Sequence, residues 1–182
     1  MEKIIHTPLT DEMARSLKAG DRVLLNGIIY SGRDAAHKRL IEMMNRGEKL
    51  PVNLDGQIIY YVGPCPAKPG QVIGSAGPTT SYRMDAFAPI LMDKGLKGMI
   101  GKGFRNKAVV DSMKKNGAVY FASIGGAGAL LAKQIKEAQV VAFEDLGTEA
   151  IHKFRVENFP VTVVIDSEGN DLYLSGKAQY KE

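Results

Sequence analysis

The sequence predicts one mixed α/β domain in which strands and helices form layers in the order β/β/α, and three observations support this prediction. The 182 residues are close to the length of a single domain. Helical and strand patterns alternate in the middle of the chain, as in parallel β-α-β units, while short strands dominate the last third. A hydrophobic fraction of 45% beside 24% charged residues is typical of globular chains that bury a full core. We therefore expect a single domain over residues 1–182 and no doubly wound sheet.

The first third of the chain is expected to alternate strands with helices. Thr10, followed by two acids, favours a helix start, because a hydroxyl and negative charge suit the free N–H groups there. Gly27 interrupts a β-rich run and suggests a bulge. Leu40, Ile41 and Met44 recur at helical spacing. The expected strands are 3–7, 22–30 and 57–62, and the expected longer helix is 33–45.

Proline positions and periodicity predict the remaining elements. Three of the eight prolines lie in 63–71, which we expect to be a surface loop because X-Pro steps disfavour helix. Beyond this loop the expected helices are 78–92 and 106–116. The expected strands are 72–75, 96–100, 119–123, 140–143, 151–156, 161–165 and 172–174, with a hairpin turn at 166–170.

Charge and cysteine content argue against several classes of protein. Lysine and arginine total 24 against 20 acids, a net charge of +4, and these basic residues are scattered along the chain. That pattern is a weak case for nucleic-acid binding but suits the attraction of small anions into a local pocket. The one cysteine, Cys65, excludes an internal disulfide and a cysteine-cluster metal site built from this chain alone. No signal peptide and no run of 18 apolar residues is visible, so we expect a soluble, cytoplasmic protein.

The most informative stretch is 77–85, with the sequence GPTTSYRMD. Pro78 suits the first position of a helix, so Thr79 and Thr80 are expected in its first turn, where free N–H groups and the helix dipole favour an anion. Arg83 follows Thr79 by four residues, so the two side chains are expected on one face, where a guanidinium can grip a carboxylate in two places. From these residues alone, a capped helix with an ion-paired surface arginine is the favoured interpretation, because helix starts and exposed ion pairs are common.

Two further motifs flank this stretch, SGRDAAH at 31–37 and MIGKG at 99–103. In that order, the three motifs resemble the β subunit of two-subunit class I fumarases and L-tartrate dehydratases, which are iron-sulfur hydro-lyases. The resemblance covers nearly the whole chain, to ENFPVTVVID at 157–166, and GPTTxxRMD is its most specific motif. It implies the β subunit of a class I fumarate hydratase, which interconverts fumarate and (S)-malate at a site shared with an α subunit.

The resemblance also implies an architecture and a site. The architecture is a swivelling β/β/α domain of the fumarase C-terminal type that closes over a [4Fe-4S] cluster held by the partner α subunit and not by this chain. Arg33, Arg83 and Lys102 are expected on the carboxylates of a C4 dicarboxylate, and Thr79 near the proton removed from it. Fixed cations suit this chemistry, because two negative charges enter a closing cleft. Whether Thr79 or an acid of the α subunit takes the proton stays open, since an unperturbed hydroxyl is very weakly acidic.

Three more residues are candidates for supporting roles. His37 follows Arg33 by four residues and is expected on the same helix face, either orienting Arg33 or packed as a structural histidine. Asp85 is expected either to support Arg83 or to form a simple surface ion pair. Thr80 points about 100° away from Thr79 on the expected helix and is expected to contribute capping or packing.

Three alternatives accompany the fumarase hypothesis. L-tartrate dehydratase shares the chemistry, and its substrate differs by one hydroxyl. A stand-alone anion-binding domain without catalysis is a hypothesis of another class. A nucleotide-binding loop at 125–128 fits poorly, because Leu131 stands where GxGxxG requires glycine; a turn that allows close backbone approach is the better interpretation.

Overall fold

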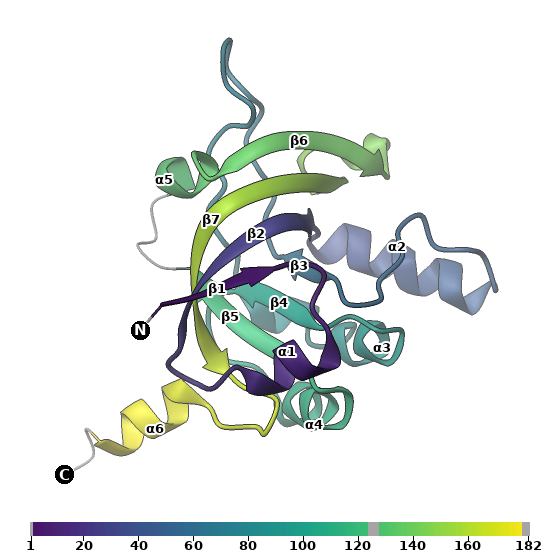
Figure 1. The fold of residues 1–182 in the computed structure, drawn as a ribbon. Coiled ribbons are helices and arrows are strands. Elements are labelled where there is room, and N and C mark those ends of the chain that lie inside the picture. Colours follow the sequence, from purple (N-terminus) through teal and green to yellow (C-terminus); the bar gives the residue numbers. More distant parts are fainter. Residues whose placement is uncertain (1, 124–127, 180–182) are drawn as a thin grey trace.

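The computed structural model describes residues 2–123 and 128–179 of the chain. Within these residues, seven strands form one sheet that curls until it closes on itself (Figure 1). The strands are β1 (Glu2–His6), β2 (Arg22–Ser31), β3 (Ile58–Tyr60), β4 (Gly98–Gly101), β5 (Val119–Ser123), β6 (Ile135–Ala142) and β7 (Ile151–Ile165). The α-helices are α1 (Asp11–Ser16), α2 (Asp34–Asn45), α3 (Ala88–Asp93), α4 (Lys107–Asn116), α5 (Gly128–Ala132) and α6 (Leu172–Gln179). Two 3-10 helices are η1 (Ser81–Met84) and η2 (Glu144–Glu149).

Strand β7 closes the sheet. Strands β1 to β5 lie side by side in chain order, and each is parallel to the next. The 15-residue β7 runs antiparallel to them, pairing with β5 through residues 161–165 and with β2 through residues 153–162. Since β2 also pairs with β3, the strands β2, β3, β4, β5 and β7 form a ring, with β1 and β6 attached beside it.

The expected bulge in β2 is present at Gly27. The register between β2 and β7 shifts between Leu25 and Gly27. Gly27 has a φ of 110°, which glycine adopts without steric cost. A Cβ at this position would lie 2.5 Å from Oγ1 of Thr7, whose hydroxyl donates to the carbonyl of Ile28 at 2.7 Å. The bulge thus lets the segment after β1 pack closely against β2.

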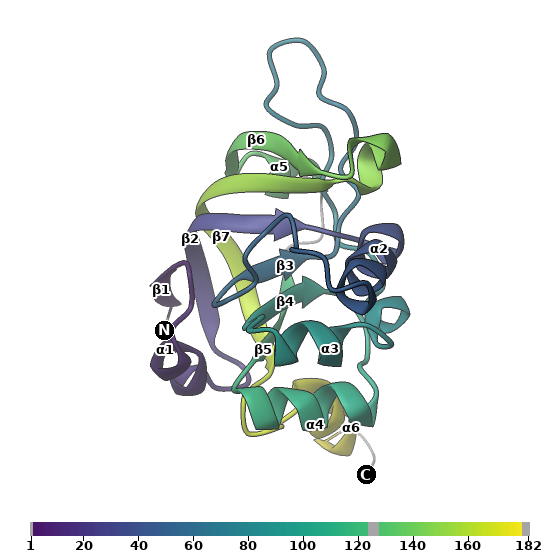
Figure 2. The ribbon, with the colours of Figure 1, turned by 90° about the vertical axis from the view of Figure 1, so that its right-hand side faces the viewer.

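Two hydrophobic cores lie on opposite faces of the strands. Two consecutive tyrosines at the end of β3 belong to different cores. Tyr60 belongs to the first core and Tyr61 to the second, and both are fully buried. The first core joins side chains of β2, β5 and β7 with those of α1, while the second lies between the sheet and helices α2, α3 and α4. Figure 2 shows these three helices along one side of the sheet. The mixed α/β class is confirmed.

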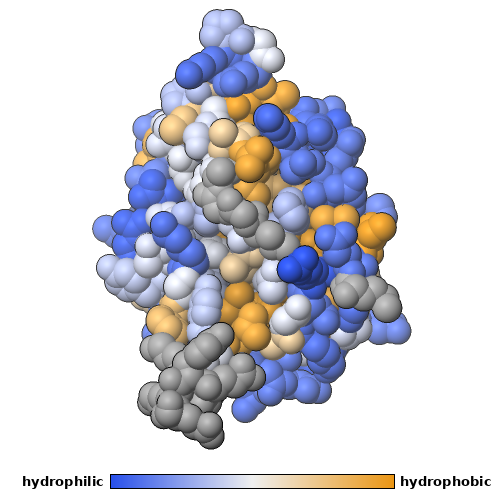
Figure 3. Space-filling model, turned by 90° about the vertical axis from the view of Figure 1, so that its left-hand side faces the viewer, coloured by the Kyte–Doolittle hydropathy of each residue, from blue (hydrophilic) through white to orange (hydrophobic). Residues whose placement is uncertain are grey.

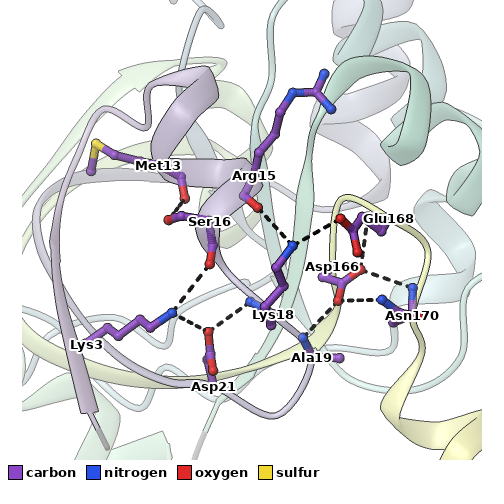
Figure 4. A network of polar contacts seen from close by, with 10 residues as sticks. All are labelled: Lys3, Met13, Arg15, Ser16, Lys18, Ala19, Asp21, Asp166, Glu168 and Asn170. Carbon is purple, nitrogen blue, oxygen red and sulfur yellow. Dashed lines mark hydrogen bonds and ion pairs between the residues drawn. The ribbon is translucent and has the colours of Figure 1, made fainter.

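The turn after β7 is fastened to the loop before β2 (Figure 4). The buried carboxylate of Asp166 accepts hydrogen bonds from the main-chain N–H groups of Ala19, Glu168 and Asn170 at 3.0–3.1 Å. Burial works to raise the pKa of Asp166, but these N–H groups and the Asn170 amide hold it below its usual value. The expected turn at 166–170 is therefore a structural anchor that joins the end of β7 to the loop before β2.

The strands expected after residue 150 differ from the structure in two ways. The strands expected at 151–156 and 161–165 are one continuous strand, β7, because the chain absorbs its bend at Asn158, where φ is 51°, and keeps pairing on both sides of it. The strand expected at 172–174 is instead the start of α6. There the Asp171 carboxylate accepts from the N–H of Tyr173 at 2.9 Å, which caps a helix.

The expected loop at 63–71 projects beyond β6, as Figures 1 and 2 show. The strand expected at 72–75 is absent, and that stretch continues the loop. Gly125–Ala127 of the glycine-rich turn lie outside the described residues, but the carbonyl of Gly128 accepts from the N–H of Ala76 at 3.1 Å.

On the face seen in Figure 3, hydrophobic areas are separated by hydrophilic ones. Within the described ranges, the helices lack the length and hydrophobicity of a membrane span.

Candidate functional site

The candidate site residues lie where parallel strands end. β2, β3 and β4 are parallel and end at Ser31, Tyr60 and Gly101, so the segments after them leave the sheet at the same edge. Arg33 comes two residues after β2, and Lys102 comes directly after β4. In parallel α/β sheets, both open and closed, ligands bind at the carboxyl ends of the strands. The topology therefore gathers residues that are far apart in the sequence.

Thr79 reaches this edge in an extended segment and not in a helix. Its N–H donates to the carbonyl of Tyr61 at 2.8 Å, and its own carbonyl accepts from the N–H of Lys102 at 3.3 Å. Thr80 forms a parallel bridge with Lys102, whose carbonyl accepts from the N–H of Ser81 at 2.9 Å. The prediction that Thr79 and Thr80 begin a helix is wrong, because the N–H and carbonyl of Thr79 pair with Tyr61 and Lys102 at the neighbouring strand ends.

The expected contact between Arg83 and Thr79 is nevertheless present. Arg83 lies in η1, and its Nη2 donates to Oγ1 of Thr79 at 2.7 Å. A charged donor fixed on a hydroxyl oxygen favours negative charge there. Nε of Arg83 lies 3.6 Å from the carboxylate of Asp34, the first residue of α2. Both members of this ion pair are more than a third exposed, so the pair is open to exchange with a ligand anion.

Arg33 and Arg83 line the same cavity. This cavity has a volume of about 440 Å³ and is lined by Arg33, Asp34, Ala35, Lys38, Arg83, Phe87 and Glu149. Such a volume suits a small ligand. Nε of Arg33 lies 3.9 Å from the Glu149 carboxylate, a long ion pair. Lys38, Phe87 and Glu149 were not singled out from the sequence, and no local pattern connects Glu149 in η2 with the start of α2.

Lys102 lines a second cavity, of about 480 Å³. Its lining is Gly77, Pro78, Gly101, Lys102, Ala122, Ser123 and Tyr173. Lys102 is exposed at the end of β4 and does not share the lining of the cavity that holds the two arginines. Thr79 is the link between the two groups, because its hydroxyl contacts Arg83 while its main chain pairs with Lys102.

His37 is a buried, neutral histidine. It is 1% exposed and packs edge-on against Tyr61, with ring centroids 5.5 Å apart. Burial lowers the pKa of His37 to about 4, helped by the charge of Arg105 and opposed by a 2.8 Å hydrogen bond between Nδ1 and the carbonyl of Arg33. His37 therefore donates from Nδ1 to the main chain of Arg33, at the point where α2 begins.

One interpretation of the sequence was that Asp85 supports Arg83. The structure contradicts it. The Asp85 carboxylate pairs instead with Arg105, with Oδ1 2.6 Å from Nε, and its other oxygen accepts from the N–H of Asn106 at 2.9 Å. Asp85 directly follows η1 and is buried, and Arg105 is the buried cation that lies just before α4. Arg105 was missed because its partner lies 20 residues away and no periodicity joins the two.

The described residues lack a cluster of metal-ligating side chains. Among residues 2–123 and 128–179, no three or more histidine, cysteine, aspartate or glutamate side chains are grouped so that they could hold a metal ion. Cys65 is exposed in the projecting loop. The described residues therefore do not fit a resident iron-sulfur cluster.

Nearly the whole chain matches a known family. A family model described as the fumarase C-terminus matches residues 2–176. The chain belongs to this fumarase C-terminal family. Fumarate hydratase 2 of Leishmania major is 45% identical over 156 residues, which are 85% of this chain and 28% of that protein. The aerobic class I fumarate hydratase of Salmonella typhimurium is also 45% identical, over 84% of this chain and 28% of its own length.

Another relative has a size similar to that of this chain. The putative L(+)-tartrate dehydratase subunit beta of Methanocaldococcus jannaschii is 42% identical over 171 residues, which are 91% of this chain and 88% of that protein. The chain thus spans little more than a quarter of the fumarate hydratases and most of the tartrate dehydratase subunit. The family resemblance read from the three motifs is confirmed.

The buried state of His37 predicts a pH-dependent stability. The pKa of His37 in the folded chain lies near 4, below the value of about 6.5 for a histidine in an unfolded chain, so the unfolded state binds more protons between these values. Stability is therefore lost as the pH falls. From about pH 7.5 to about pH 5, we expect His37 to account for a loss of about 2 kcal/mol in the free energy of unfolding.

Urea denaturation at both pH values measures this loss. The His37→Gln variant is the matched comparison, because the carboxylates and the other histidines titrate equally in both proteins. We expect the wild type to lose about 2 kcal/mol more than the variant over this interval. Equal losses in the two proteins would show that His37 is not buried as a neutral group.

Proposed function

We propose that this chain is the β subunit of a two-subunit class I fumarate hydratase and catalyses, with its α subunit, the reversible hydration of fumarate to (S)-malate. One observation carries the proposal. The Thr79 hydroxyl accepts a 2.7 Å hydrogen bond from Arg83 in a chain that belongs to the fumarase C-terminal family, at an edge where Arg33 and Lys102 add two more cations. A swivelling domain that closes over the partner chain is part of the same proposal.

The charges at this edge suit a C4 dicarboxylate. Arg33 and Arg83 line one cavity and are assigned here to a substrate carboxylate, which can replace their long contacts with Glu149 and Asp34. Lys102, on the other side of the Thr79 main chain, is assigned to the second carboxylate once the domain closes. Removing a proton beside a carboxylate places further negative charge on the substrate, so fixed cations stabilise the transition state.

In this proposal, Thr79 takes the proton that is removed from the substrate. The Thr79 hydroxyl accepts from Nη2 of Arg83 at 2.7 Å, and the guanidinium favours the anionic form of that oxygen. The [4Fe-4S] cluster belongs, in this proposal, to the α subunit, because the described residues of this chain do not fit it. No step assigned to this chain depends on the cluster.

L-tartrate dehydratase is the second candidate. It is favoured by the relative from Methanocaldococcus jannaschii, whose length the chain nearly covers. The two substrates differ by one hydroxyl group, and a site that hydrogen-bonds this hydroxyl would reject the substrate that lacks it. A domain that only binds anions is the outcome if neither reaction occurs.

The proposal is tested by reconstituting the chain with an iron-sulfur α subunit under anaerobic conditions. The assay follows the appearance of fumarate from malate by absorbance and, separately, the dehydration of L-tartrate. We expect the complex to turn over malate faster than tartrate, and this chain alone to turn over neither. Full activity of this chain without a partner, or a stable complex that is inactive on both substrates, would contradict the proposal.

Arg83 is expected to tolerate no substitution by lysine. An ammonium group cannot reproduce the planar fork that donates to Thr79 while it holds a carboxylate. In Arg83→Lys we expect kcat/KM to fall by about 30-fold to 1000-fold, which corresponds to about 2–4 kcal/mol of transition-state stabilisation. Steady-state kinetics of the reconstituted complex measure this effect.

Arg46→Lys is the matched control. Arg46 caps the far end of α2 and pairs with Glu48 in solvent, away from the cavity. We expect its kinetics to equal those of the parent complex. An Arg83→Lys complex within a factor of two of the parent would place Arg83 outside the reaction.

A further inference from the structure

A buried ion pair lies beneath the candidate site. The Arg105 side chain is 0% exposed and that of Asp85 is 8% exposed, with 2.6 Å between Nε and Oδ1. The second carboxylate oxygen of Asp85 accepts from the N–H of Asn106. Removing charges from water costs several kcal/mol per ion, and apolar pairs of similar size are often as stable. Stability alone is therefore a weak reason for this pair.

The guanidinium of Arg105 lies between two tyrosine rings. Its central carbon is 5.2 Å from the ring centroid of Tyr61 and 4.8 Å from that of Tyr120. Its Nη2 also donates to the hydroxyl of Tyr61 at 3.2 Å. A planar cation stacked on two aromatic faces fixes both rings by cation–π attraction and by contact.

Each ring leads to a different part of the candidate site. The main-chain carbonyl of Tyr61 accepts from the N–H of Thr79 at 2.8 Å. The hydroxyl of Tyr120 shares a 2.7 Å hydrogen bond with that of Ser81 and lies 2.9 Å from the carbonyl of Gly103. Tyr120 thus joins Ser81 and Gly103, the residues that directly follow the bridged pair Thr80 and Lys102.

The space around these groups is closely filled. A Cβ added to Gly101 would lie 2.8 Å from Cδ2 of Tyr61 and closer still to the hydroxyl of Ser81. Atoms packed this closely transmit a shift of one ring to the neighbouring main chain. A displacement of Tyr61 or Tyr120 therefore moves Thr79 or Lys102.

We propose that Arg105 is a positioning residue, which sets the relative placement of Thr79 and Lys102 by fixing Tyr61 and Tyr120, with Asp85 holding Arg105 in place. Arg105 contacts no ligand in this proposal and acts through the two rings. Its consequence for turnover rests on the proposed function, while its consequence for the order of the Thr79 segment does not.

The first test measures amide hydrogen exchange in the full chain. The double variant Asp85→Leu/Arg105→Met removes both charges and leaves no unpaired ion in the interior, so it is expected to fold. We expect the N–H groups of Thr79 and Ser81 to exchange about tenfold faster or more, while the N–H of Val163 in β7, which donates to Asp21, keeps its rate. Unchanged exchange at Thr79 and Ser81 in a folded double variant would overturn the proposal.

The second test uses the reconstituted complex. A shift of about 1 Å in a reacting group costs on the order of 100-fold in rate, so we expect kcat of the double variant to fall by tenfold or more, with a smaller change in KM. Tyr120→Phe removes only the hydroxyl that joins Ser81 and Gly103 and should lower kcat without lowering the melting temperature by more than a few degrees. A purely structural role would lower the melting temperature and leave kcat of the folded protein unchanged, which would overturn the proposal.

Two comparisons keep this result interpretable. Arg155→Met removes a partly exposed arginine that pairs with Glu137 and Glu157, and it should change neither exchange nor kcat. If the double variant does not fold, Tyr120→Phe decides in the same two assays. If the parent complex has no hydro-lyase activity, the proposed function fails, whereas amide exchange at Thr79 and Ser81 still decides the role of Arg105.

Discussion

The parallel pairing of β2, β3 and β4 is the constraint on which the site depends, because it makes these strands end at one edge. Arg33 follows β2 and Lys102 follows β4, and the segment that carries Thr79 is hydrogen-bonded to Tyr61 after β3 and to Lys102 after β4. Since β7 pairs with both β2 and β5, the sheet is closed, and hydrogen bonds hold β2 to β5 at a fixed separation through β7. The placement of the candidate residues is thus a property of the sheet rather than of any single loop.

Two kinds of arginine meet at this edge, and their surroundings explain their different assignments. Arg33 and Arg83 are partly exposed and have long ion pairs of 3.9 Å and 3.6 Å, so a ligand carboxylate competes with weak partners. Arg105 is buried, has a short ion pair with Asp85 and touches two rings. Arg33 and Arg83 are thus suited to binding an anion, and Arg105 is suited to holding the rings of Tyr61 and Tyr120 in place.

Local patterns in the sequence predicted the elements whose stability is local. The helix expected at 106–116 is present as α4, where the Asn106 side chain accepts from the N–H of Val109, and Gly27 marks the expected bulge. The helix expected at 78–92 is present only as η1 and α3, and its expected start at Pro78 is wrong because the Thr79 N–H pairs with Tyr61, a tertiary contact that periodicity does not encode. The pairing of Asp85 with Arg105 escaped for the same reason, although a buried carboxylate requires a cation from somewhere. The spacing of four residues placed Arg83 beside Thr79, whereas Arg33 and Lys102 were joined to them by family resemblance alone.

The most direct measurement of the central claim is the exchange of the substrate C3 hydrogen with solvent deuterium in the reconstituted α/β complex. If Thr79 takes the proton, Thr79→Ser keeps the hydroxyl beside Arg83 and retains exchange, while Thr79→Val keeps the shape without the hydroxyl and slows exchange by about 100-fold or more. Thr80→Val, whose contacts at the site are with Lys102 through the main chain, should exchange at the parent rate. Exchange at the parent rate in Thr79→Val would contradict the account and assign the proton to an acidic residue of the α subunit.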